Sequence, residues 1–449
     1  MKHTGVIFFP AFDWAISSTH PEREERLLYT RDQIFEEGIM DLPQIKEYKP
    51  RLAEKKDIAR VHFCIPDIKA QVTEAHLVSA GSALVIADAV MQGEVDNGFS
   101  IARPPGHHAM TVAHGNRGFC NINNEAIMIE YLRKKYAIRK IAVVDTDVHH
   151  GDGSQEIFYD DPDILFISFH QDGRTLYPGT GFIEELGGPV AWGTNINIPL
   201  QPNTTDAGIL YALEHLIMPV LQEFEPELVV NSAGQDNHYS DPLANMRFTA
   251  HGYAELNTRL APDIAVLEGG YSVETALPYI NMALLMAMAG IDYSNLREPD
   301  YDPRNFRESA ANMDYIKRLT EIQLNNFRQR SEVVQDNRKR YGEEYRQSRQ
   351  IFYDTDYINE AQKCRLKICP NCAGWRTIDS EARHRDGRDY HVLCISAPVF
   401  ACPECQQAAR QAYKDMAGNS SRFDYIYLQD KANDVFISLD TSNGREEVV

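Results

Sequence analysis

Short apolar runs alternate with longer amphipathic stretches over the first two thirds of the chain. The runs are rich in β-branched residues and apolar at nearly every position, which indicates parallel strands buried on both faces. They predict strands at 5–9, 99–102, 140–144, 164–169, 228–231 and 264–267. The stretches between them predict helices that include 124–135, 206–225 and 250–260. We therefore expect an α/β fold, with a parallel sheet between two layers of helices.

The composition changes after residue 300. Arg, Gln, Glu and Asn dominate residues 302–356, which predicts one or two long polar helices. Such a segment is either a connector packed along the main domain or a dimerisation helix. Strand-like runs return at 425–428 and 435–439. Because 449 residues exceed what one hydrophobic core usually holds, we expect three parts. They are a main α/β domain at 1–300, a helical connector at 301–360 and a small module at 361–449.

The charge of the chain limits its partners. A formal net charge of -20 disfavours general adhesion to nucleic acid or anionic lipid, because neither polyanion releases counterions to so acidic a surface. A cationic substrate suits this surface better. The chain has no run of about 18 or more apolar residues, and its apolar stretch at 6–15 is interrupted by Pro10 and Asp13. We expect a cytoplasmic protein that does not enter a membrane.

The first candidate site follows the apolar run at 141–144. Asp145, Asp147 and His149 occupy alternate positions there, so in an extended chain their side chains point to one side. Burying several like charges is unfavourable unless a cation compensates them. The segment therefore predicts a metal site, although a polar loop with a hydrogen-bonded histidine fits the same pattern.

Three more predicted strands end in polar loops, and the carboxyl ends of parallel strands meet at one edge of a sheet. Asp236, in Asn-Ser-Ala-Gly-Gln-Asp, offers a third metal ligand. His107 and His108 follow Pro-Pro-Gly. Paired histidines can take a proton from water and return it to a leaving amine, although metal ligands and ordinary loop residues are alternatives. Tyr271 follows Gly-Gly, where its hydroxyl can stabilise an oxyanion or the ring can simply pack.

Together these segments resemble the zinc-dependent histone deacetylase family, including its bacterial and acetylpolyamine-cleaving branches. The resemblance covers roughly residues 4–290 and includes a His20-Pro21-Glu22 opening. Seven separated motifs agree in order, namely 103–109, 118–124, 145–153, 177–181, 232–236, 241–243 and 268–271. The resemblance implies the arginase-like fold, a three-layer α/β/α sandwich around an eight-stranded parallel sheet. Residues 1–300 would then be a zinc-dependent deacetylase catalytic domain.

The resemblance also implies two metal ions in this domain. A catalytic Zn²⁺ would be held by Asp147, His149 and Asp236, with an open position for water and the substrate carbonyl. A K⁺ ion would lie beside it, held partly by backbone oxygens. The potassium ligands would come from Asp145, Asp147, His149, Ser168 and Phe169.

The same resemblance assigns the catalytic side chains. His108, oriented by Asp152, would act as general base and then as general acid. His107, paired with Asp145, would be its electrostatic partner on the same water. Tyr271 would polarise the scissile carbonyl.

A narrow channel for an aliphatic acyl-lysine stem is a further implication of the resemblance. Phe119, preceded by Gly118, and Tyr177 would form its walls, with Leu243 at the rim. Leu243 stands where a dedicated polyamine deacetylase of this family carries a Glu, which favours lysine over polyamine. Gln235 replaces the family's usual apolar residue, and we expect it to reshape the rim.

Cysteines are concentrated in the C-terminal part of the chain. Cys369-Pro-Asn-Cys372 and Cys402-Pro-Glu-Cys405 are two knuckles separated by 29 residues. Each knuckle can present two thiolates to one tetrahedral metal. We expect a structural Zn²⁺ in a zinc ribbon and a reducing compartment, with a redox dithiol pair as the alternative. The basic stretch at 383–388 is either a solvated loop or a contact for an acidic partner.

The leading functional hypothesis is zinc-dependent deacylation of N-acyl-lysine in proteins, most simply of acetyl-lysine. Deacylation of acetylpolyamines or other small N-acyl amines is the alternative in the same class. A binding or scaffold protein that acts through the zinc ribbon is the alternative in another class. We also expect the connector and the ribbon to offer the contacts for a homo-oligomer or a partner protein. A binuclear manganese ureohydrolase is a further alternative on the same fold, but the Pro-Pro-Gly-His-His segment has no role in that chemistry.

Overall fold

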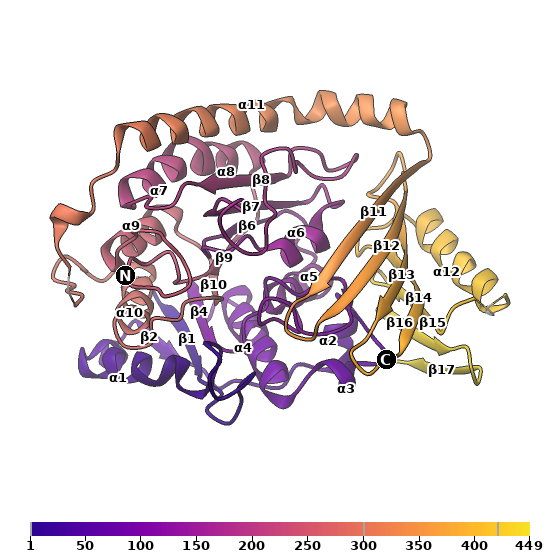
Figure 1. The fold of residues 1–449 in the computed structure, drawn as a ribbon, viewed down its shortest axis with the longest axis horizontal. Helices are drawn as coiled ribbons and strands as arrows, with labels where there is room; N and C mark the ends of the chain where they lie inside the picture. The colour runs from indigo at the N-terminus through magenta and orange to yellow at the C-terminus, as the bar shows by residue number, and fades with distance from the viewer. Residues whose placement is uncertain (1, 300, 420–421) are drawn as a thin grey trace.

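An eight-stranded, fully parallel sheet forms the centre of the molecule (Figure 1). The computed structural model describes residues 2–299, 301–419 and 422–449. In order across the sheet, the strands are β2 (Ile45–Glu47), β1 (Thr4–Phe9), β4 (Asn97–Ala102), β10 (Ile264–Leu267), β9 (Leu228–Ala233), β6 (Ile141–Asp145), β7 (Ile164–Gln171) and β8 (Asn195–Leu200).

Two hydrophobic cores lie on opposite faces of this sheet. Successive residues of a strand alternate between the faces, so Ile141 and Val143 belong to one core and Ala142 and Val144 to the other. The first core is covered by α2 (Lys55–Ala59), α4 (Glu74–Met91) and α5 (Asn124–Tyr136). The second is covered by α1 (Leu28–Glu36), α7 (Asp206–Ala212), α8 (Met218–Phe224), α9 (Ala250–Leu260) and α10 (Leu277–Ala289). The expected three-layer α/β/α fold is confirmed.

All six predicted strands are present, and the sheet adds two strands at its edges. β2 has only three residues, so it carries little pattern. β8 contains Asn195 and Asn197, which interrupt its apolar run. Both asparagines are buried and donate to the side-chain oxygen of Gln155 at 2.8 Å, which lowers the cost of burying them. The predicted helix 206–225 is α7 and α8 joined by a π-helical turn at Leu213–Ile217.

One helix among the described residues, α4, has the length and composition to cross a membrane. Within the fold, 61% of it is buried. It packs on β1 and β4 and against α5. This is how a core helix of an α/β layer packs.

The predicted connector contains one long helix, α11 (Ala310–Tyr341), which runs along the outside of the main domain (Figure 1). Its Ile316 and Phe327 are fully buried and belong to the second core. The buried Gln323 donates to the backbone carbonyl of Asn197 on the edge strand β8 at 2.7 Å. These contacts favour the interpretation of a packed connector.

The rest of the connector differs from the prediction. Residues 344–353, expected to be helical, form β11 (Glu344–Tyr353), which pairs with β12 (Ile358–Lys367) over its whole length. This pairing outweighs the polar composition that suggested a helix. The C-terminal module is a seven-stranded sheet that begins at Glu344 and not at 361. Its other elements are β13 (Trp375–Arg383), β14 (Asp389–Ala397), α12 (Pro403–Ala417), β15 (Tyr425–Asp430), β16 (Val435–Asp440) and β17 (Arg445–Val448).

The module is docked on the main domain through buried polar contacts. Glu156, in α6 (Asp152–Phe158), forms ion pairs with Arg349 at 3.0 Å and Arg376 at 3.6 Å. The hydroxyl of Tyr427 donates to the carbonyl of Pro66 at 2.8 Å. Hydrogen-bonded and ion-paired groups of this kind fix the orientation of the module relative to the main domain. The module and the main domain are therefore packed together as parts of one structure.

One buried histidine makes the fold sensitive to acid. His62 Nδ1 lies 2.8 Å from the carbonyl of Met110, and its Nε2 accepts the N–H of Asn123 at 2.8 Å, so the ring is neutral. Burial lowers the pKa of His62 to about 4, from 6.5 in an unfolded chain. Between these values the unfolded chain binds a proton that the folded chain does not. We therefore expect His62 to lower the free energy of unfolding by about 2 kcal/mol as the pH falls from 7 to 5.

Urea denaturation of His62→Gln at several pH values tests this expectation. The substitution should flatten the dependence of the unfolding free energy on pH in this window. The same change at the exposed His215 should leave the slope unchanged. An equal slope in His62→Gln and the unmodified protein contradicts the assignment.

Candidate active site

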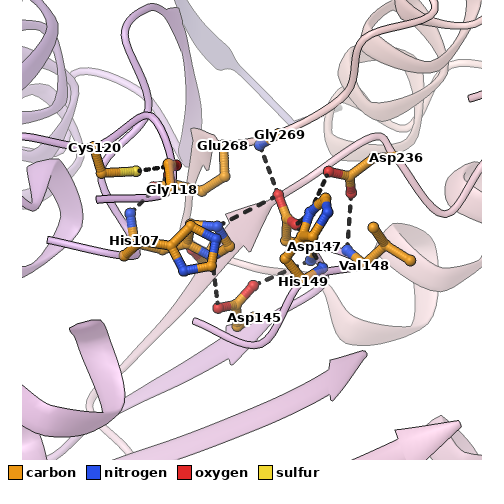
Figure 2. Close-up of polar contacts among 12 residues, drawn as sticks. His107, Gly118, Cys120, Asp145, Asp147, Val148, His149, Asp236, Glu268 and Gly269 are labelled. Carbon is orange, nitrogen blue, oxygen red and sulfur yellow. Dashed lines mark hydrogen bonds and ion pairs between the residues drawn. The ribbon is translucent and has the colours of Figure 1, made fainter. Parts of the chain in front are cut away.

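The carboxyl ends of four neighbouring strands form the candidate site. β4, β10, β9 and β6 lie side by side, and the predicted residues lie at their ends or in the loops that follow. Figure 2 shows His107, Asp145, Asp147, His149 and Asp236 gathered at this edge. The structure therefore brings together segments that are far apart in the sequence.

Asp147, His149 and Asp236 lie close enough to share one metal ion. His149 Nδ1 is 3.1 Å from an oxygen of each aspartate, and the three ligand atoms lie within 4.8 Å of one another. Both aspartates are fully buried. Although burial opposes it, the two carboxylates raise the pKa of His149 to about 10. A bound cation compensates this buried negative charge, so the donor set fits a divalent metal.

The backbone around these ligands leaves room for the carboxylates and orients them. A Cβ atom on Gly269 would lie 2.2 Å from Asp236 Oδ2 and 2.4 Å from Asp147 Oδ2, so only glycine fits there. The N–H of Gly269 donates to Asp147 Oδ2 at 2.6 Å, and the N–H of Val148 donates to Asp236 Oδ1 at 2.8 Å (Figure 2). Hydrogen bonds of this kind fix the geometry of metal ligands.

Two buried histidine–carboxylate pairs lie beside the three ligands. His107 Nδ1 is 3.1 Å from Asp145 Oδ2, and His108 Nδ1 is 2.8 Å from Asp152 Oδ1. Arg117 forms a close ion pair with the other oxygen of Asp152. Against the effect of burial, Arg117 lowers the pKa of Asp152 below its ordinary value. Asp152 is therefore a charged acceptor that orients the His108 ring.

The two histidines differ in charge because their surroundings differ. Burial, reinforced by the neighbouring His107, lowers the pKa of His108 to about 4. Burial also acts against a charge on His107, but the carboxylates of Asp147 and Asp145 raise its pKa well above 6.5. These surroundings favour a neutral His108, which can accept a proton, and a positive charge on His107. Two titratable neighbours with separated pKa values are typical of acid–base sites.

Glu268 is a site residue to which the sequence analysis gave no role. Its Oε2 accepts the N–H groups of Gly106 at 2.7 Å and His107 at 3.0 Å. Burial raises the pKa of Glu268 to about 8. The side chain holds the backbone that carries both histidines.

A buried charge network also connects the N-terminal segment to the site. Glu22 accepts from Arg26 at 2.8 Å and from Arg103 at 2.7 Å, and all three side chains are fully buried. Arg26 donates to the carbonyl of Gly270 at 2.8 Å and lies 4.8 Å from the centre of the Tyr271 ring. In the sequence, Glu22 belongs to the His-Pro-Glu motif. Its ion-pair partner Arg26 follows four residues later, and this spacing was the one local sign of the pair.

Aromatic rings line the approach to these residues. The Phe119 ring lies 5.5 Å from the ring of Tyr271, and the Tyr177 ring lies 5.2 Å from the ring of His108. Phe119 and Tyr177 are both half-buried. The predicted wall residues therefore flank the catalytic candidates.

The predicted rim residues occupy different environments. Leu243 is half-buried, and its N–H donates to Asp241 at 2.9 Å. The other oxygen of Asp241 accepts the N–H of Tyr271 at 2.7 Å. Gln235 is fully buried and donates to Asn281 of α10 at 3.1 Å. The expectation that Gln235 reshapes the rim is therefore wrong, because its side chain is held inside the fold.

A second candidate metal site lies in the C-terminal module. The sulfur atoms of Cys369, Cys372, Cys402 and Cys405 lie within 4.8 Å of one another. The N–H groups of Asn371 and Gly374 donate to two of these sulfurs at 3.4 and 3.3 Å. Backbone N–H groups stabilise thiolates, which are the form that binds zinc. The first knuckle precedes β13, and the second begins α12.

We expect Cys369→Ser to remove one equivalent of zinc per chain and to lower the melting temperature. The substitution removes a thiolate from the site, and the binding free energy of structural zinc, on the order of 10 kcal/mol, contributes directly to folding. Elemental analysis and calorimetry of the purified full chain measure both effects. Cys364→Ser is the matched control, because Cys364 lies on β12 and outside the cluster. An unchanged zinc content in Cys369→Ser contradicts this site.

Comparisons with known proteins identify the family of the chain. A family model described as the histone deacetylase domain matches residues 67–287. A probable deacetylase of Archaeoglobus fulgidus is 43% identical, and the match covers 70% of this chain and 97% of the relative. The acetoin utilization protein AcuC of Bacillus subtilis is 32% identical, with 67% and 86% covered.

A solved structure extends the agreement to three dimensions. The crystal structure of the HDA15 HD domain superposes with a TM-score of 0.64 at 26% identity, covering 75% of this chain and 98% of that one. The family resemblance of the sequence motifs is thus confirmed. This chain belongs to the histone deacetylase family and is a hydrolase of the deacetylase type.

Proposed function

We propose that this chain hydrolyses the amide bond of N-acetyl-lysine residues in proteins, with Zn²⁺ as its catalytic metal. One observation carries the proposal: two buried histidine–carboxylate pairs lie beside a buried Asp–His–Asp ligand set. Membership in the histone deacetylase family supports the same reaction class.

Asp147, His149 and Asp236 would hold the zinc ion. One imidazole and two carboxylates suit zinc, and three protein ligands leave coordination positions open. When bound, the ion supplies a Lewis acid for the scissile carbonyl and for the attacking water.

His108 would move the proton in this reaction. Its Nδ1–H donates to the charged Asp152, because a carboxylate can only accept. Nε2 therefore carries a lone pair that can take a proton from water as the water oxygen bonds to the carbonyl carbon. When the C–N bond breaks, His108 returns this proton to the lysine nitrogen. The products are acetate and the free amine.

His107 and Tyr271 would stabilise the charge that develops on the substrate. His107 is fixed by Asp145, whose carboxylate favours a positive charge on its ring. Tyr271 is 8% exposed, and its phenol would donate to the carbonyl oxygen as negative charge builds there.

We also propose a K⁺ ion beside the zinc site. Asp145 of β6 and Ser168 of β7 are register partners, and Phe169 follows in the same strand. Backbone oxygens of these strands, with those near Asp147 and His149, are the hard ligands that potassium requires. The ion would offset part of the negative charge under the catalytic residues.

Comparing two acetylated amines tests the substrate class. We expect the zinc-loaded full chain to release acetate from an acetyl-lysine peptide faster than from acetylspermidine, because Leu243 offers no charge to a distal ammonium. Faster turnover of acetylspermidine would instead favour the small-amine alternative. Release of acetate from neither substrate, in a preparation with its full zinc content, overturns the proposed function.

A further inference from the structure

The hairpin between β11 and β12 extends from the C-terminal module to the main domain (Figure 1), where its tip bonds to Gly118 and Tyr177. β11 ends at Tyr353 and β12 begins at Ile358, so residues 354–357 form the tip. These residues lie beyond the segment 67–287 that the deacetylase family model matches. The hairpin contacts therefore lie outside the segment that the family model matches.

One carboxylate oxygen at this tip joins both walls of the channel. Asp354 Oδ1 accepts the N–H of Gly118 at 2.9 Å and the hydroxyl of Tyr177 at 3.0 Å. Gly118 precedes the wall residue Phe119, and Tyr177 is the opposite wall. Asp354 is half-buried, so water competes little for these two bonds.

Two neighbouring contacts reinforce this junction. The carbonyl of Phe352 accepts from Arg117 at 2.7 Å, and Asp356 accepts the N–H of Asn116 at 2.6 Å. Arg117 also donates to the Tyr177 hydroxyl at 3.1 Å. Residues 116, 117 and 118 are thus each bonded to the hairpin, and Arg117 extends the connection to the partner carboxylate of His108.

The loop that the hairpin holds has an unfavourable backbone. Phe119 adopts a φ of 71°, in the left-handed region that side chains other than glycine rarely occupy. At the preceding position, a Cβ on Gly118 would lie 2.4 Å from the His108 ring. Such a conformation persists when surrounding contacts enforce it. The hairpin supplies several of these contacts.

We propose that Asp354 is a positioning residue that determines specificity, because it holds Phe119 and Tyr177 at the separation that admits an unbranched aliphatic stem. This inference rests on the proposed deacetylase function. It makes the C-terminal module part of the active site. Without Asp354 the hydrogen bond from Arg117 to Tyr177 still joins the two walls, but they are held less firmly, so a straight stem binds less tightly and a wider stem is admitted.

Kinetics of Asp354→Ala on two peptides test the specificity. One peptide carries N-acetyl-lysine, and the other carries N-acetyl-4-aminomethylphenylalanine, whose stem is an aromatic ring. We expect KM for the lysine peptide to rise about tenfold, as for the loss of one to two hydrogen bonds, with a smaller change in kcat. The kcat/KM of the wide substrate relative to the lysine substrate should rise.

Three further variants separate positioning from general damage. Asp354→Asn keeps an oxygen acceptor and should restore most of the selectivity. Tyr177→Phe removes the hydroxyl that bonds to both Asp354 and Arg117, so it should loosen the walls at least as much as Asp354→Ala. Asp386→Ala is the matched control, because Asp386 caps another hairpin tip of the same sheet and should leave both substrates unaffected. Selectivity in Asp354→Ala equal to that of the unmodified chain overturns the proposal.

Hydrogen–deuterium exchange gives a result that does not depend on catalysis. In Asp354→Ala the peptide covering residues 115–122 should exchange faster, because the Gly118 N–H loses its acceptor, while β6 stays protected. Unchanged exchange in residues 115–122 also overturns the proposal. If the unmodified chain hydrolyses neither peptide, the proposed function fails. The exchange experiment still decides whether Asp354 holds the loop at residues 115–122.

Discussion

Replacing His108 with Gln is expected to lower kcat by about 10³- to 10⁴-fold without loss of zinc. Gln keeps the size and polarity of the side chain but cannot carry the proton from water to the leaving amine. The Asp152 carboxylate would remain paired with Arg117, so the surrounding structure should persist. Steady-state kinetics on an acetyl-lysine peptide, with elemental analysis of the same preparation, measure the effect.

A second buried histidine provides the control for this variant. Burial lowers the pKa of His76 to about 4, as it does for His108, but His76 lies on α4 and bonds to Asn121 at 3.1 Å. His76→Gln should leave kcat of the folded protein nearly unchanged. Full activity in His108→Gln would show that another group transfers the proton.

Replacing Tyr271 with Phe is expected to lower kcat by about 10²- to 10³-fold, the usual cost of removing one oxyanion donor. KM should change little, because the lost hydrogen bond strengthens only as charge develops on the carbonyl oxygen. The aromatic ring remains, so the guanidinium of Arg26 keeps its stacking partner at 4.8 Å. The loss should therefore appear in kcat and not in the melting temperature.

The matched control is Tyr131→Phe, which removes a hydroxyl on α5 that bonds to Asp88 of α4. It should alter neither kinetic constant. If Tyr271→Phe raised KM and left kcat unchanged, the phenol would be binding the ground state of the substrate and the proposed oxyanion role would be wrong.

Regular apolar patterns made six strands of the main sheet predictable. The strands β8 and β11 were missed because polar residues interrupt this pattern in both. The six predicted strands are largely buried on both faces, so their sequence is apolar at nearly every position. β8 was missed because its Asn195 and Asn197 are buried with Gln155 as a partner from another segment. β11 was missed because its polar side chains lie on the exposed positions of a paired strand, which a composition-based prediction does not detect.

The candidate site was predictable where residues lie close together in the sequence. Asp145, Asp147 and His149 alternate along one strand end, and the structure keeps them together. Glu268 was missed, and so was the contact of Arg26 with the site, because both depend on distant partners. The carbonyl of Gly270 that Arg26 binds lies 244 positions away, and Asp354 lies 236 positions from Gly118. No local pattern encodes such contacts.

The helix α11 has a further consequence for the main sheet. An open strand edge is a template on which another chain can add a strand, and natural proteins commonly cover such edges. At one edge, β2 has only three residues. The other edge is β8, where Pro199 has no N–H to donate. The carbonyl of Asn197 in the same strand already accepts a hydrogen bond from Gln323 of α11. Without α11 in place the β8 edge would offer such a template, so α11 protects the main sheet from strand addition by another chain.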